Sequence, residues 1–274
     1  MTCVRCGAAL DGCSSHANCA KCSAPVWLSL DGDWLCVRAP AWLHHARMGA
    51  TFWIWALWLT VLAGVVGYAT PRLLIPAGRA WNFAARFIII WTDDVPFVAS
   101  LLGWLAAFLL TTINPAARAT EGRWTLRRFV RLSLLAGIAL EVLCRVSWSV
   151  VETETHPLPP TLTVAAVAAD AVTCLGLIAY VCRLCQRLPD DRLCSRLELA
   201  FWGFAAYWSC SILQMAAWFA VVQSSIRHHG GHSALPYPGL LLAQEVLLSI
   251  LSIWLATLLT RFRRELRKIG AIDS

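Results

Sequence analysis

A change of chemistry near residue 48 constrains the fold of this chain more than any other feature of its sequence. Residues 1–47 are mixed in polarity and contain six of the 12 cysteines. The remainder is dominated by long apolar blocks that are separated by arginine-rich or acidic turns. A membrane-crossing helix needs about 20 predominantly apolar residues, and the blocks have this length. The sequence therefore predicts a short soluble segment followed by a multi-pass membrane protein.

Six apolar blocks are candidates for membrane spans. They cover residues 48–71, 95–117, 129–151, 161–182, 199–226 and 239–260. The chain is 58% hydrophobic and only 14% charged, against about 25% charged in soluble proteins. Each block is far longer than the ~10-residue strands of a membrane barrel, so we expect six helices. The first block begins too late for a cleaved signal peptide, and we expect it to remain as an anchor.

Basic residues predict the orientation of these spans. Cytoplasmic loops of membrane proteins collect lysine and arginine. Eighteen of the 23 basic residues lie in the N-terminal segment, in the loops after the second and fourth blocks, and in the tail after the sixth block. Cysteines follow the same division, because none falls in the three opposite loops and the cytoplasm keeps thiols reduced. Both termini are therefore expected on the cytoplasmic side.

The loop between the first two blocks has a pattern of its own. Within residues 72–94, the side chains of Arg79, Asn82 and Arg86 share one helical face among apolar neighbours. Such a stretch is typical of an amphipathic helix that lies in the membrane interface. The alternative is that this stretch extends the second span into one long tilted helix.

Two Cys-x2-Cys pairs in the N-terminal segment predict a structural zinc site. Cys3 and Cys6 form the first pair, and Cys19 and Cys22 form the second. Zn2+ prefers four thiolate ligands in tetrahedral geometry, and the two pairs supply this set. Gly7 follows the first pair and allows the backbone to curl around the sulfur atoms. Metal binding is also the natural source of folding energy for so short a segment.

Residues 26–37, with an Asp-Gly-Asp turn at their centre, have the pattern of a β-hairpin. Together with the paired cysteines, this hairpin resembles the short rubredoxin-like zinc ribbons, over residues 1–37 only. Ser23 departs from the glycine that is usual after the second pair. Nearby residues that could replace a ligand are Cys13, His16 and Cys36.

The predicted fold class is an all-α polytopic membrane protein with a small N-terminal β zinc ribbon. Its parts are the cytoplasmic ribbon (1–37), a linker (38–47), a six-span bundle (48–260) and a basic cytoplasmic tail (261–274). This organisation is similar to that of bacterial multi-pass membrane proteins that carry a ribbon, which implies the inner (plasma) membrane but no particular activity. The ribbon has too few basic residues for nucleic acid, so the expected partners are the lipid bilayer and a cytoplasmic protein.

Four ionisable residues interrupt the spans: Glu141, Arg145, Asp170 and Glu245. Charges at membrane depth are energetically costly and commonly mark function. Along ideal helices all four lie in the outer half of the bilayer, and Glu141 and Arg145 are one turn apart on the same helix face. We expect this layer to be either a structural clamp between helices or the lining of a cavity for protons, cations or a polar solute.

Other residues of interest lie nearer the membrane boundaries. The roles of the thiols Cys182, Cys185 and Cys194 and of the loop histidines His228, His229 and His232 stay open. Five tryptophans are expected to be interface anchors rather than a ligand cage: Trp42, Trp53, Trp55, Trp91 and Trp148.

The sequence favours a function without catalysis. It contains no metalloprotease, nucleophile-elbow or phosphate-loop motif, so an enzyme is not expected. The leading prediction is a membrane scaffold or regulator whose zinc ribbon recruits a cytoplasmic protein. The alternative is a transporter or channel that uses the intramembrane polar layer.

Overall fold

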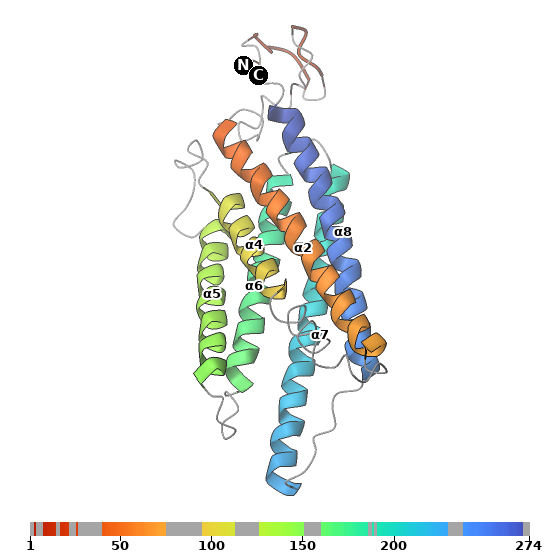
Figure 1. The fold of residues 1–274 in the computed structure, drawn as a ribbon. Coiled ribbons are helices and arrows are strands. Elements are labelled where there is room, and N and C mark those ends of the chain that lie inside the picture. The colour runs from red at the N-terminus through yellow and green to blue at the C-terminus, as the bar shows by residue number, and fades with distance from the viewer. Residues whose placement is uncertain are drawn as a thin grey trace.

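The computed structural model of the chain describes residues 3, 8–14, 17–21, 26, 40–74, 95–112, 126–150, 160–185, 188, 191–229 and 238–270. These residues form six helices, shown in Figure 1: α2 (Pro40–Leu74), α4 (Val95–Leu110), α5 (Leu126–Val150), α6 (Pro160–Cys185), α7 (Asp191–His229) and α8 (Pro238–Gly270). Each helix coincides with one predicted apolar block, so the predicted all-α bundle is confirmed. The predicted interface helix (79–88) lies outside the described residues, as does almost all of the predicted hairpin.

The ends of several helices differ from the predicted bounds. Helix α2 begins at Pro40, so most of the predicted linker is helical. Helix α8 continues to Gly270 and includes most of the predicted basic tail. Proline is well tolerated in the first turn of a helix, where its missing N–H has no intrahelical partner to lose. These extensions place charged side chains on the same rigid helices as the apolar spans.

Helix α4 is shorter than predicted and ends at Leu110. The hydroxyl groups of Thr111 and Thr112 donate hydrogen bonds to the carbonyl oxygens of Ala107 and Leu109, at 2.6 and 2.7 Å. Side chains that bond to nearby backbone in this way compete with continued helix. Helix α4 therefore ends short of the predicted block, which hydropathy alone extends to residue 117.

The six helices pack in a closed ring. Helix α2 packs against α4 and α8, α6 packs against α5 and α7, and α7 packs against α8. Helices α4 and α5 are in contact as well. Each helix thus contacts its neighbour in the chain, and the last helix returns to the first, as Figure 1 shows for α2 and α8.

Small residues allow α2 and α4 to approach closely. A Cβ atom placed on Gly49 would lie 2.8 Å from the Leu110 Cγ atom and 3.0 Å from the Ala106 carbonyl oxygen. Ala46 and Ala50, on either side of Gly49, are fully buried. Membrane helices commonly associate through small residues because these let the backbones meet.

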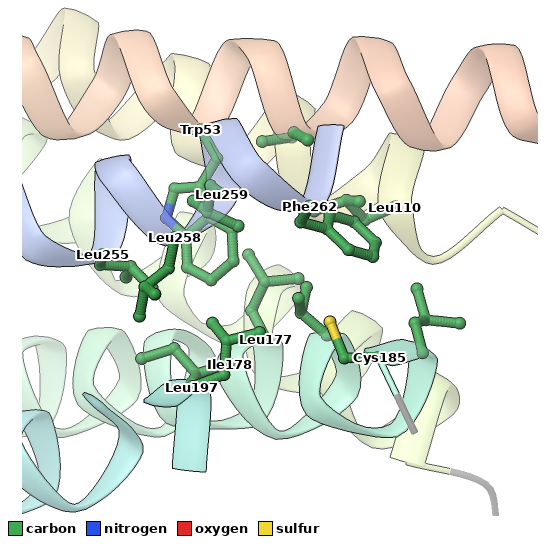
Figure 2. Close-up of a cluster of buried hydrophobic side chains, with 14 of the residues drawn as sticks. Trp53, Leu110, Leu177, Ile178, Cys185, Leu197, Leu255, Leu258, Leu259 and Phe262 are labelled. Atoms are coloured by element: carbon green, nitrogen blue, oxygen red, sulfur yellow. The ribbon is translucent and has the colours of Figure 1, made fainter. Parts of the chain in front are cut away.

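The centre of the bundle is a continuous apolar core to which all six described helices contribute. Figure 2 shows Leu255, Leu259 and Phe262 of α8 among side chains of α6 and α7, including Ile178 and Leu197. All five of these side chains are fully buried. The core therefore couples the last helix to the middle of the chain.

Arg131 links α5 to the end of α4. Its guanidinium group donates hydrogen bonds to the Thr111 carbonyl oxygen at 2.8 Å and to the Thr111 hydroxyl at 3.1 Å. It also lies 5.1 Å from the centre of the Phe108 ring, within the range of a cation–π interaction. The last carbonyl groups of a helix lack intrahelical partners. Arg131 therefore supplies a hydrogen-bond donor to a carbonyl group at the end of α4.

Among the described residues, three helices are long and apolar enough to cross a membrane: Trp42–Gly67 in α2, Val164–Cys185 in α6 and Ala243–Lys268 in α8. Helix α4 is apolar but shorter. Glu141 and Arg145 interrupt the apolar stretch of α5, and that of α7 includes tryptophan, tyrosine, serine and glutamine. Polar content and length thus separate these three helices from the other three.

Candidate functional site

A cavity of about 280 Å³ lies inside the ring of helices. Its walls come from α2, α4, α6, α7 and α8. Four aromatic side chains form much of the lining: Trp53, Trp104, Phe204 and Trp208. The polar lining groups are those of Thr60, Ser100, Asp170, Thr173 and Ser252. A mostly apolar cavity with a few convergent polar groups is the usual form of a small-molecule site.

Asp170 is the single acidic residue in this lining. It lies on α6 and faces α5 at Gly137, where an added Cβ atom would be 3.5 Å from the Asp170 Oδ1 atom. Glu141 lies one turn further along α5 and acts electrostatically on Asp170. The structure therefore brings together two of the four predicted ionisable residues, and of these two only Asp170 lines the cavity.

Two buried polar atoms at the cavity have no hydrogen-bond partner among the described residues: the Trp208 Nε1 atom and the Ser252 hydroxyl. The Cys174 thiol interacts with the Trp208 side chain, but the indole N–H meets no acceptor in hydrogen-bond geometry. Buried polar groups in proteins almost always have partners. Both residues line the same cavity, which makes the cavity the natural place for a partner.

Glu245 lies apart from the cavity. Its Oε2 atom faces Gly64 of α2, where an added Cβ atom would be 3.2 Å away. The neighbouring Gln244 donates a hydrogen bond to the Ser211 hydroxyl of α7 at 2.9 Å. The predicted polar layer is thus divided between the α5–α6 contact and the contacts of α8 with α2 and α7. The Arg145 side chain lies outside the described residues.

The tryptophan prediction is wrong for Trp53. This residue lies about 16 Å along α2 from Trp42, at a rise of 1.5 Å per residue, and its side chain is buried against the cavity. Trp42 is buried too, and its Nε1 atom donates a hydrogen bond to the Thr112 carbonyl oxygen at 3.2 Å. Trp55 is 59% exposed, as expected of a lipid-facing side chain. Depth within the first apolar block was the signal that separates Trp53 from an interface residue.

The thiols near the end of α6 pack in the apolar core. Cys185 is buried in it, and Cys182 and Cys194 pack against it. None of the nine described cysteines forms a disulfide. The described residues contain no group of three or more histidine, cysteine or acidic side chains that could hold a metal ion. Ordinary packing is therefore the role that the structure supports for these three thiols.

The N-terminal segment has a small core of its own. Cys3 and Cys19, the first cysteine of each predicted zinc-binding pair, are 3% and 2% exposed and pack in one cluster with Leu10 and Val26. The Cys3 amide donates a hydrogen bond to the Ala8 carbonyl oxygen at 2.6 Å. The other predicted ligands, Cys6 and Cys22, lie outside the described residues, as do His16 and Cys36.

The predicted histidine group is described only through its backbone. His228 and His229 are the last two residues of α7, and their side chains and all of His232 lie outside the described residues.

Comparison of the whole chain with known protein families, curated proteins and solved structures finds no match.

Proposed function

We propose that this protein is a membrane carrier that binds a small organic cation in the cavity inside the helix ring. The observation that carries the proposal is the Asp170 carboxylate in a cavity walled by four aromatic side chains. A carboxylate attracts an ammonium group, and aromatic faces attract it further through cation–π interactions. In the low dielectric of a membrane protein such a charge pair is stronger than in water.

The unpartnered polar atoms narrow the class of solute. The Trp208 indole N–H can only donate a hydrogen bond. Apart from the weakly accepting Cys174 sulfur, it has no described acceptor. A small amine that also carries a hydroxyl or carbonyl oxygen satisfies both Asp170 and Trp208. The cavity volume of about 280 Å³ is just below the ~300–1,000 Å³ of drug-sized sites, which favours a solute with few heavy atoms.

The test is amine binding by the purified full-length protein in detergent, measured as ligand-induced thermal stabilisation. Primary amines bearing an oxygen should stabilise the protein, and the matched neutral alcohols should not. Asp170→Asn keeps the shape and removes the charge, so we expect Kd to rise about 10- to 100-fold, since a hydrogen bond to a charged group contributes about 1.5–3 kcal/mol. Uptake of the same amine into proteoliposomes should fall in parallel.

The matched control for this test is Glu245→Gln. It removes a carboxylate of α8 that does not line the cavity, so amine binding should persist. Trp208→Phe keeps the aromatic face and removes the N–H. It should therefore weaken the binding of oxygen-bearing amines more than the binding of plain alkylamines. If no amine stabilises the wild-type protein, the carrier proposal is wrong.

We also propose that all six helices span the membrane, with both termini in the cytoplasm. Large apolar side chains are exposed on every described helix, with Val172 as the example on α6. They include Trp55, Leu62, Leu101, Phe108, Leu132, Leu135, Leu199, Leu213, Val246 and Ile250. Apolar patches of this extent are rare on soluble proteins and suit contact with lipid. This observation supports membrane placement for α4, α5 and α7 as well.

Cysteine-accessibility labelling checks this topology. In a background without accessible native thiols, cysteines introduced at Thr155 and Ser233 should react with a membrane-impermeant reagent from outside. Cysteines at Thr120 and Asp190 should react only after the membrane is opened, because the basic loops stay in the cytoplasm. Labelling of position 155 from the inside contradicts the six-span arrangement.

A second function is proposed for the N-terminal segment. Burial of Cys3 and Cys19 in one small cluster supports a zinc-stabilised module, because it gathers the first thiol of each pair. Such a module, held at the membrane by the bundle, suits the recruitment of a cytoplasmic protein. Co-purification from native membranes with and without residues 1–37 tests recruitment, and loss of a partner on deletion is the expected result.

A further inference from the structure

A second cavity, of about 340 Å³, lies between the start of α2 and the end of α8. Helix α2 contributes His44, Arg47 and Thr51 to it, and helix α8 contributes Arg263, Arg264 and Arg267. This cavity is separate from the one that contains Asp170, and the two share no lining residue. We name it the arginine pocket.

Helical spacing explains how six polar side chains meet there. His44, Arg47 and Thr51 follow one another at three- and four-residue steps, and so do Arg263 or Arg264 and Arg267. Residues at these steps share one helix face. Helices α2 and α8 pack against each other and run in opposite directions in Figure 1. The two basic faces therefore meet in one pocket, near the start of α2 and the end of α8.

The positive charges in the pocket have no described acidic counterpart. Glu265, the acidic residue in the same stretch of α8, pairs with Lys268 at 2.7 Å. The one side-chain bond across the pocket joins Arg263 Nη1 to the Thr51 hydroxyl at 3.4 Å. No described carboxylate forms an ion pair with any of the four arginines. Like charges held this close are unfavourable unless an anion lies between them.

The position and the chemistry of the pocket point to one class of anion. His44 and Arg47 lie in the first turns of one candidate span, and Arg263, Arg264 and Arg267 lie in the last turns of another. The pocket is therefore at the membrane boundary, at the depth of lipid headgroups. Guanidinium groups match phosphate oxygens with paired hydrogen bonds. Arginines near the C-terminus of α8 also complement the dipole of that helix. The dipole alone does not explain why they face the basic residues of α2.

We propose that the arginine pocket binds a phosphate group at the membrane boundary. The group comes either from an anionic phospholipid or from a soluble phosphate, and both use the same contacts. Arg47 on one wall and Arg264 and Arg267 on the other grip the phosphate oxygens. Binding adds a further link between the first helix and the last at this end of the bundle.

The experiment uses the full-length purified protein in two arms. Native mass spectrometry measures binding of dioleoyl phosphatidylglycerol, with dioleoyl phosphatidylcholine as the zwitterionic comparison. Equilibrium dialysis measures binding of radiolabelled inorganic phosphate at constant ionic strength. Arg264→Gln with Arg267→Gln should raise Kd about 10- to 30-fold, since each arginine near an anionic headgroup contributes about 1 kcal/mol. Arg47→Gln should weaken binding from the opposite wall.

The control variant is Arg192→Gln with Arg196→Gln. These two arginines are exposed, lie one turn apart on α7 and do not line the pocket. Both double variants remove two positive charges, so the net charge of the protein changes equally. Binding in this variant should stay close to that of the wild-type protein. Saturable binding of phosphatidylglycerol alone identifies the lipid as the source, and binding of inorganic phosphate identifies the soluble ion. Equal losses in both double variants overturn the proposal, and so does a lack of preference over phosphatidylcholine together with a lack of inorganic phosphate binding.

Discussion

Gly49→Ala should destabilise the protein by about 1–3 kcal/mol, although alanine favours helix over glycine by roughly 1 kcal/mol. The added Cβ atom meets the Ala106 carbonyl oxygen and the Leu110 amide nitrogen, both at 3.0 Å. These are backbone atoms of α4, so neither can rotate away as a side chain would. The only relief is to separate α2 from α4, which opens a buried contact along the ring.

Gly103→Ala is the matched control for this substitution. Gly103 lies within α4, and an added Cβ atom there meets nothing within 4 Å. The same chemical change should therefore leave stability unchanged or raise it by up to about 1 kcal/mol, through helix propensity alone. Thermal unfolding in detergent, followed by tryptophan fluorescence, measures both variants. Equal effects at the two glycines contradict the close approach of α2 and α4.

The helices themselves were predictable because hydropathy is a local property. Each described helix coincides with an apolar block, from the block at 48–71 to the block at 239–260. Helix ends were predicted less well, because they depend on single side chains. Helix α4 ends at Leu110, although hydropathy alone extends its block to residue 117.

Contacts between distant parts of the chain could not be predicted from apolar blocks. Thr51 and Arg263 are 212 residues apart, and only the packing of α2 against α8 brings the two basic faces together. The same residues were read as determinants of orientation, which requires a charge but no partner. Periodicity shows that Arg47 and Thr51 share a face, yet which helix covers that face is decided by the whole ring.

Asp170 was predicted as part of a polar layer, and its direction decides its function. A clamp requires it to pair across helices, whereas a binding site requires it to face a cavity. The glycine at position 137 provides room for its carboxylate beside α5, and the cavity lies on its other side. Glu245 had the same sequence signature but faces α2 instead. Side-chain direction around a helix of nearly uniform hydropathy therefore separates two residues that the sequence treats alike.

Replacing Cys3 or Cys19 with serine should release one zinc ion per chain and unfold the N-terminal segment. Both side chains are buried in the small cluster that contains Leu10 and Val26, a core too small to hold the segment together by itself. Structural zinc contributes about 10–16 kcal/mol to the folding of small zinc-finger peptides, so loss of one thiolate should remove most of the folding energy. Elemental analysis of the purified full-length protein measures the zinc content, and proteolysis of residues 1–37 measures unfolding.

Cys13→Ser is the matched control for the zinc site, because Cys13 is exposed and lies outside the buried cluster. It should retain the metal and its resistance to protease. Treatment of the wild-type protein with a strong chelator should reproduce the Cys3 and Cys19 variants while leaving amine binding in the helix ring intact, since no element of the cavity comes from residues 1–37. Zinc loss in Cys13→Ser, with retention in Cys3→Ser, would move the site to the alternative ligands Cys13, His16 and Cys36. Absence of zinc from the wild-type protein would show that the buried thiols serve packing alone.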